Sequence, residues 1–264
     1  AASTSADVSS GRFGFALEAT LPGPTEAFAF SGTGAFDTES NRSEFTFDFS
    51  SFAKLLGGLL TGLGAPEDGA PDFNDPSAWQ IEAIQDGETM YMRFPALDSE
   101  LPEGKSWVRM DAGAEAQAQG FDLSQFQQFT GDDRSKMLDF LRAASGEVET
   151  VGPDELHGVT TTHYRATVDL AEYEKLVPAS EREEAGTMVD EMLEQLGSTE
   201  LPVDVWLDEQ GLVRQLEMSF SAAQPGTPES AEASVIFELY DYGADVGIVP
   251  PPAADVADAS ALTG

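Results

Sequence analysis

The chain has no cysteine, little positive charge and no long hydrophobic run. Without cysteine, its 264 residues can form no disulfide, no cysteine-bound metal site and no thiol nucleophile. Thirteen Lys and Arg residues against 48 Asp and Glu give a net charge of −35, which disfavours nucleic acids and anionic lipid surfaces as partners. No segment approaches the ~20 consecutive apolar residues of a membrane-spanning helix. The simplest role of the charge is solubility, including in a salty setting that screens self-repulsion.

Motifs of common catalytic and cofactor sites are also missing. The chain has no nucleophile elbow, phosphate-binding loop, dinucleotide-binding glycine pattern, EF-hand or His-Glu-x-x-His. His157 falls in a predicted turn, and His163 falls mid-strand, where we expect a solvated side chain. Residues 72–75 (DFND) leave weak calcium binding open, and the many carboxylates leave a glycosidase-type pair open. We predict a non-enzymatic protein with no cofactor and no metal site.

The first part of the chain alternates like half-buried strands and then changes period. Residues 12–20, 27–37 and 45–49 predict three strands, and Gly32 and Gly34 predict a bend or bulge in the second. Residues 52–63 then carry one apolar stripe at helical spacing. Interior glycines loosen this helix by roughly 1 kcal/mol each. We interpret the helix as an apolar cover that can shift.

A hairpin follows a loop at residues 64–77. Asp86 and Gly87 are a strong two-residue turn signal. That turn predicts cross-strand pairs Ala83–Met90, Ile81–Met92 and Trp79–Phe94 on one face, with Glu82–Tyr91 and Gln80–Arg93 on the other.

Further strands are predicted at 105–111, 147–151, 159–168, 201–208, 212–220 and 232–242, and helices at 122–144 and 181–196. Hairpin-linked strands with segregated helices predict an α+β fold with a large curved antiparallel sheet, wrapped over two or three helices. We divide the chain into a flexible leader (1–11), a single domain (12–249) and a Pro/Ala-rich extended tail (250–264). Two similar halves, 12–111 and 147–242, are the alternative.

Residues 151–164 (VGPDELHGVTTTHY) resemble a signature of actinobacterial cell-envelope lipoproteins of the LppX and LprG group. Residues 86–91, 104–108, 203–208 and 242–250 match the same group, so the resemblance spans most of residues 12–256. It implies the half-barrel of the lipoprotein carriers LolA and LolB, with about ten or eleven antiparallel strands wrapped over helices. Members are exported and anchored through an acylated cysteine. Because this chain has none, either that cysteine was trimmed away or this is a soluble relative.

The resemblance also implies a function. Several members of the group hold lipids or glycolipids in a hydrophobic cavity and move them across the envelope. We therefore predict an exported, non-enzymatic carrier, located in the cell envelope, a periplasm-like space or outside the cell. Its expected partners are a lipid or other hydrophobic ligand and an envelope transporter or acceptor protein. The membrane is reached only through a lost N-terminal lipid anchor.

The candidate lining of the ligand cavity is chosen from the large apolar residues. The 17 Phe and 7 Met residues provide a wide, adaptable apolar surface. Plain core packing explains the same residues, and the alternative function is an acidic protein-interaction or structural envelope module with a filled core. The candidates are Phe45, Phe47, Phe49, Phe52, Leu55, Leu56, Leu59, Leu60, Leu63, Ile81, Met90, Met92, Tyr164, Met188 and Met192.

Overall fold

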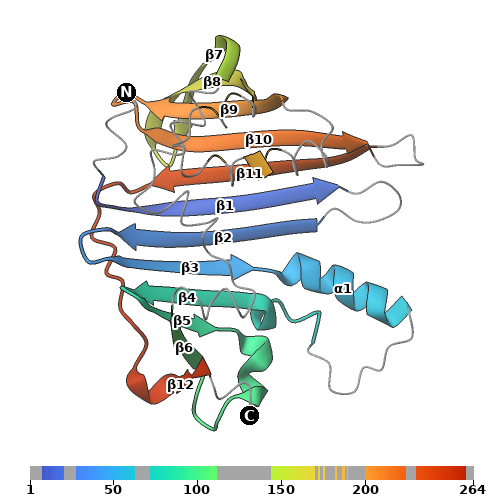
Figure 1. Ribbon diagram of the computed structural model, residues 1–264, viewed down its shortest axis with the longest axis vertical. Helices are drawn as coiled ribbons and strands as arrows, with labels where there is room; N and C mark the ends of the chain where they lie inside the picture. The colour runs from blue at the N-terminus through green and yellow to red at the C-terminus, as the bar shows by residue number, and fades with distance from the viewer. Residues whose placement is uncertain are drawn as a thin grey trace. The chain divides into compact units, whose positions relative to one another are not determined.

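The computed structural model describes residues 8–20, 28–62, 72–111, 144–169, 172, 175, 182, 186–187, 189, 200–223 and 230–259. Its strands form a twelve-stranded, mostly antiparallel sheet in the order β12-β6-β5-β4-β3-β2-β1-β11-β10-β9-β8-β7 (Figure 1). The chain divides into two compact units with main segments 28–125 and 126–240. These segments fall near the two halves considered from the sequence, and the single domain stays a prediction.

One unit contains β2 to β6, the helix α1 and the C-terminal segment, together with residues 9–14. The polar and apolar alternation of the sequence produces these strands. The strand bounds are β1 Ser10–Thr20, of which residues 10–14 belong to this unit, β2 Phe28–Asp37, β3 Arg42–Asp48, β4 Gln80–Asp86, β5 Thr89–Arg93, β6 Trp107–Asp111 and β12 Val256–Asp258. The helices are α1 Ser50–Gly62 and the short 3₁₀ helices η2 Pro76–Trp79, η3 Pro95–Glu100 and η4 Ala253–Asp255.

The hairpin of β4 and β5 forms, but its predicted register is wrong by two residues. Asp86 pairs with Thr89 and Ala83 with Met92, so Gly87 and Glu88 are the central turn residues. Gly87 has φ +63°, whereas Glu88 is not in the positive-φ region. Glycine in the first central position is typical of a type II′ turn, and the prediction placed it second. A shift of two keeps every side chain on its face, so the predicted faces are right.

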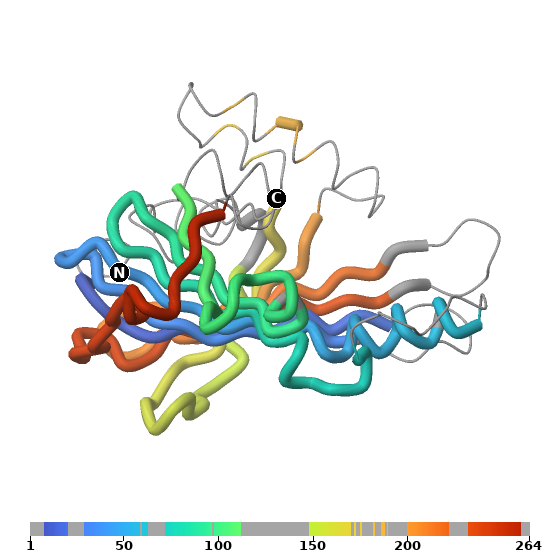
Figure 2. The backbone as a smooth tube through the Cα atoms, turned by 90° about the horizontal axis from the view of Figure 1, so that it is seen from below, coloured from blue at the N-terminus to red at the C-terminus, as the bar shows by residue number. Residues whose placement is uncertain are grey.

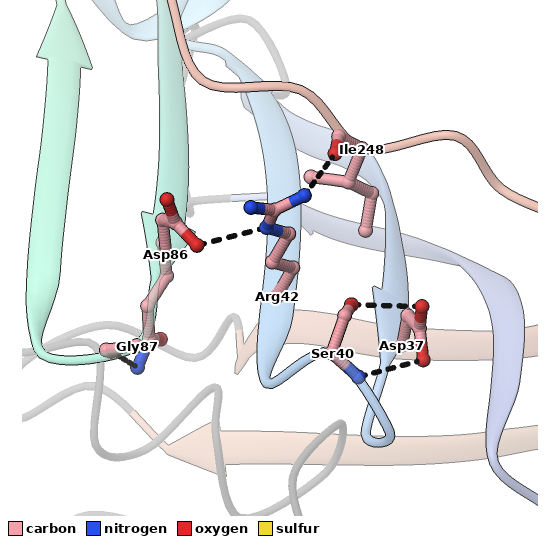
Figure 3. A network of polar contacts seen from close by, with 7 residues as sticks. Asp37, Ser40, Arg42, Asp86, Gly87 and Ile248 are labelled. Carbon is pink, nitrogen blue, oxygen red and sulfur yellow. Dashed lines mark hydrogen bonds and ion pairs between the residues drawn. The ribbon is translucent and has the colours of Figure 1, made fainter.

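The C-terminal segment after Asp241 packs on the polar side of β2 to β4. Val246 and Ile248 are buried against Ala35, with Ile84 beside them. Figure 3 shows the polar contacts next to this cluster: Arg42 donates from Nε to Asp86 at 2.8 Å and from Nη1 to the Ile248 carbonyl at 3.4 Å. The segment then ends in β12, which pairs parallel to β6.

This pairing corrects the predicted tail at 250–264, because residues 256–258 are a strand of the sheet. A backbone hydrogen bond also holds residues 256–258 beside β6. The Ser106 amide donates to the Asp255 carbonyl at 3.0 Å, just before the paired strands begin. At the other end of the chain, Ser10 and Gly11 belong to β1 and not to a leader.

The second unit contains β7 Ala144–Leu156, β8 Val159–Asp169, β9 Glu200–Asp208, β10 Val213–Ala223 and β11 Ser230–Tyr240. All the pairs from β7 to β11 are antiparallel. The predicted helix at 122–144 lies outside the described residues, except for its last residue, Ala144, which begins β7. Within 181–196, the described residues Arg182, Gly186, Thr187 and Val189 are helical. One complete α-helix, α1, is present in the described part of the chain, so two or three helices are not confirmed.

Candidate ligand-binding face

One side of β2 to β6 is a continuous apolar surface, which we call the β2–β6 face. Residues directly opposite each other in antiparallel strands point to the same side of a sheet. Phe47 lies opposite Ile81, Phe45 opposite Ala83, and Met92 opposite both Ala83 and Val108. Met90 lies opposite Met110. Each of these side chains is at most 7% exposed, so the face is a buried apolar layer.

Aromatic rings cover the start of this face. The ring of Phe30 lies 5.7 Å from that of Phe47 and 4.5 Å from that of Phe49. Gly32 and Gly34 of β2 make room for rings: a Cβ on Gly32 would stand 2.8 Å from Phe47, and one on Gly34 would stand 2.3 Å from Phe13. The register of β2 and β3 runs without interruption across both glycines. No bulge interrupts the pairing of β2 with β3 at these glycines, where the missing side chains allow close packing.

The helix α1 follows Phe49 directly and is anchored by small residues. Ala53 is fully buried, and a Cβ on Gly57 would stand 2.6 Å from the Cβ of Phe73. Phe73 in turn stacks on Trp79, with ring centroids 5.3 Å apart. At 3.6 residues per turn, Ala53, Gly57 and Leu60 lie within about 60° of one another around the helix axis. This Ala53–Gly57 seam is the side by which α1 is held, next to β2 and η2.

The predicted apolar stripe of α1 is therefore only partly buried. Leu56 and Leu60 lie beside the seam, both on the same side of it, and are half-buried, and Leu55 is also half-buried. Phe52 is 47% exposed, because it lies about 100° around the helix from Ala53. Figures 1 and 2 show α1 continuing outward from the end of β3.

The structure brings one group of the predicted lining residues together. Phe45, Phe47, Phe49, Ile81, Met90 and Met92 lie in or beside the β2–β6 face. Leu63, Met188, Met192 and the side chain of Leu59 lie outside the described part of the chain. Tyr164 belongs to the other unit. The ligand lining itself stays a prediction.

Sequence reasoning missed Phe13, Phe30, Val108 and Met110 as members of the same layer. The available signal was the position of Phe30, Val108 and Met110 at alternate sites of predicted strands. What the sequence lacked was the pairing of β5 with β6, which places Met110 opposite Met90.

The other unit also has an apolar and a polar side. Val168 pairs with Leu201, Ala166 with Val203, and Leu216 with Val205 and Phe237. Val168, Leu201, Val203, Leu216 and Phe237 are at most 3% exposed, so this side is a core layer. Tyr164 joins it opposite Val205 and is half-buried.

The polar side of this unit holds His163, which is not solvated as predicted. Its side chain is 15% exposed, and its ring stacks on Trp206 at 4.1 Å. His163 Nε2 is hydrogen-bonded to Asp204, whose Oδ1 also accepts from Arg165 Nε at 3.0 Å. The pairing of His163 directly opposite Trp206 explains the burial, because the indole covers the imidazole.

Asp154 completes this group of side chains. It accepts hydrogen bonds from the Glu155 amide at 2.8 Å and from Trp206 Nε1 at 3.0 Å. These two bonds hold the pKa of the Asp154 carboxyl below its ordinary value. The Asp204 carboxylate likewise raises the pKa of the Arg165 guanidinium above its ordinary value. These contacts join His163, Asp204, Trp206 and Asp154 on the polar side of this unit.

The remaining features are an open pocket and the residues that the sequence left open for calcium binding. An open pocket of about 290 Å³ near the ends of β9 to β11 is lined by Glu200, Leu201, Pro202, Ser219, Phe220, Ser221 and Glu232. Within the described ranges, no group of three or more His, Cys, Asp or Glu side chains is placed to hold a metal ion. In the segment 72–75, Asp72 and Asp75 accept from the amides of Asn74 and Ser77 and so shape turns. No helix in the described part of the chain is long and apolar enough to cross a membrane.

Three solved structures align with most of this chain at low sequence identity. LprF from Mycobacterium bovis aligns over 95% of this chain and 92% of its own, with 14% identity and a TM-score of 0.46. The lipoprotein LppX of Mycobacterium tuberculosis aligns over 92% and 91%, with 8% identity and a TM-score of 0.44. A LolA-superfamily protein from Nitrosomonas europaea aligns over 92% of this chain and 89% of its own, with 8% identity and a TM-score of 0.25. The predicted resemblance is confirmed as a resemblance.

By sequence, the chain is similar to an uncharacterized 31.2 kDa protein of Streptomyces griseus from the rplA–rplJ intergenic region. It is 28% identical over 159 residues, which is 59% of this chain. The match spans about half of that relative, 48% of its length. No protein-family model matches the chain.

Proposed function

We propose that this protein is a non-enzymatic carrier that binds a lipid or other amphiphile at the β2–β6 face, beside α1. The observation that carries the proposal is the composition of that face. It joins aromatic rings at one end to three methionines, Met90, Met92 and Met110, at the other. Methionine side chains are unbranched and adapt to irregular apolar shapes. Such a layer suits acyl chains, whose burial contributes ~0.8 kcal/mol for each CH₂ group.

The position of α1 supports a route to that face. The helix begins directly after Phe49, and the half-buried Leu56 and Leu60 lie beside the seam that holds it. Among the described side chains of α1, only the small residues Ala53 and Gly57 are buried, so the half-buried leucines can move at low cost in buried area. We propose that movement of α1 admits the ligand. Export, a location in the cell envelope and a transporter or acceptor protein as partner belong to the same proposal.

The first test is native mass spectrometry of the protein purified from its own host, followed by organic extraction. A co-purified lipid or other amphiphile in near-stoichiometric amount supports the carrier and identifies the cargo. An empty protein that also rejects added phospholipids and glycolipids contradicts it. That outcome favours the acidic interaction module with a filled core, with which the nearly complete burial of Met90 also agrees.

A pair of neighbouring variants tests the part played by α1. Leu60→Asp places a carboxylate beside the seam and should abolish loading, because burying an unpaired charge is costly. Thr61→Asp adds the same charge on the exposed side of the helix and should load monomeric lysophospholipid, which needs no bilayer, like the unmodified protein. Circular dichroism checks that both variants fold. Equal loading by the two variants would show that α1 is not part of the binding site.

A further inference from the structure

The helix α1 leaves an exposed strip that differs from the rest of this acidic chain. Phe52, Lys54, Gly58, Thr61 and Gly62 are exposed, and Leu55 is half-exposed beside Phe52. We call these six residues the exposed strip of α1. It contains an aromatic ring, a leucine and a cation, but no carboxylate.

The absence of carboxylates extends beyond the helix. Residues 49–66 contain no Asp or Glu and form the longest such stretch in a chain with 48 acidic residues. The stretch coincides with the helix that presents Phe52 at 47% exposure. The longest stretch without carboxylates therefore contains a large apolar side chain that is exposed.

We propose that the exposed strip of α1 docks on the surface of a lipid bilayer, with Phe52 and Leu55 inserted among the lipids and Lys54 near the phosphates. An interfacial helix binds by inserting apolar side chains at the boundary between headgroups and acyl chains. Lipid phosphates repel carboxylates, so a contact surface within a chain of net charge −35 has to be free of them.

The same charges disfavour the other occupants of the strip. A second copy of the chain would bring a second charge of −35 and the repulsion that goes with it. A basic protein partner would select the acidic surface and not the longest stretch without carboxylates. The surface of a zwitterionic bilayer can bury the apolar side chains, and its phosphates favour a protein surface without carboxylates.

This inference deepens the proposed function, on which it rests for its biological meaning, because it locates where the carrier would meet its source of lipid. Docking at α1 places the membrane contact next to Phe49, at the end of the β2–β6 face. Cargo would then pass between bilayer and protein along the element that we propose to move.

Vesicle flotation tests the docking. The unmodified protein should float with phosphatidylcholine vesicles. Phe52→Glu should lower the bound fraction at least about ten-fold, because burial of an aromatic side chain is worth roughly that factor. Val249→Glu is the matched control, since Val249 is 69% exposed and far along the chain, and it should float normally. Absence of flotation by the unmodified protein, or an equal loss in both variants, overturns the proposal.

Lys54→Glu provides a second variant that removes no apolar surface. Because Lys54 is exposed, this variant should fold and should load monomeric lysophospholipid normally. Its flotation with vesicles that contain phosphatidylglycerol should fall more than its flotation with phosphatidylcholine. Unchanged flotation with both vesicles would contradict the placement of Lys54. A dimer in solution that Phe52→Glu dissociates, without vesicle binding, would assign the strip to a second copy and overturn the proposal.

Loading and flotation of the unmodified protein separate the two proposals. Loading of monomeric lysophospholipid needs no bilayer, so loading without flotation rejects the docking and leaves the carrier intact. Flotation that depends on Phe52, without any loading, rejects the carrier and leaves a membrane-binding helix.

Discussion

Two adjacent glycines in α1 show how much the surroundings of a single residue matter. Gly57 faces the Ala53–Gly57 seam, where an added Cβ would stand 2.6 Å from Phe73. Gly58 faces open space, with no heavy atom within 4 Å of an added Cβ. The two positions have the same helix propensity, so packing alone distinguishes them.

Gly58→Ala should raise the free energy of unfolding by about 0.5–1 kcal/mol, because alanine loses less backbone entropy in a helix. Gly57→Ala gains the same propensity but must displace Phe73, and we expect a net loss of up to about 2 kcal/mol. Urea denaturation of both variants measures the difference. A stabilised Gly57→Ala variant would show that α1 is not held by this seam.

At the scale of elements, the turn between β9 and β10 is organised by one buried carboxylate. Asp208 Oδ1 accepts from the amides of Gln210 and Leu212, both at 2.9 Å. Its Oδ2 accepts from Arg214 at 2.7 Å, and the two side chains are only 4% and 13% exposed. The carboxylate thus joins the turn backbone to the strand that follows it.

Asp208→Ala should lower the free energy of unfolding by about 3–5 kcal/mol, because it leaves the buried Arg214 without this carboxylate. Glu209→Ala, at the exposed neighbouring position, should change stability by no more than about 0.5 kcal/mol. Chemical denaturation checks both values. Similar losses in the two variants would mean that the turn tolerates rearrangement.

The β4–β5 hairpin shows which parts of an element the sequence can predict. Its existence and its two faces followed from the alternation around Asp86 and Gly87. Its register did not, because a glycine with positive φ fits the first or the second central position of different tight turns. The structure selects the first position and so pairs Glu82 with Arg93, which form an ion pair at 2.8 Å.

At the scale of the whole molecule, the net charge of −35 acts against the folded state. Compaction brings like charges together, and the resulting repulsion is screened by salt. The ion pairs Arg109–Asp258 and Lys175–Glu172 are largely exposed, so they add little stability to offset this repulsion.

Thermal stability should therefore increase when salt is added. We expect the Tm to rise from low to physiological and higher NaCl, with about 2–4 °C for each kcal/mol gained in a chain of this size. Differential scanning calorimetry in NaCl and in KCl measures the effect, and the two salts should agree. A Tm that stays flat or falls would show that attractive ion pairs outweigh the repulsion.

The candidate site was predictable where local alternation decides burial. Phe45, Phe47, Ile81, Met90 and Met92 are buried as their strand positions predict. The burial of the apolar stripe of α1 was not predictable. Helical periodicity identifies the apolar side of the helix, but it does not show which part of that side contacts a neighbouring element. Phe73 selects Gly57 as the contact, and Phe52 is left exposed as a consequence.

The sequence by itself determined the strand faces, the position of α1, the acidic surface and the carboxylate-free stretch at 49–66, since each depends on local order or on composition. Tertiary structure decided the register of β4 and β5, the capture of residues 256–258 by β6 and the burial of His163 against Trp206. These outcomes depend on partners far away in the chain, and a single sequence gives no direct information about such pairings.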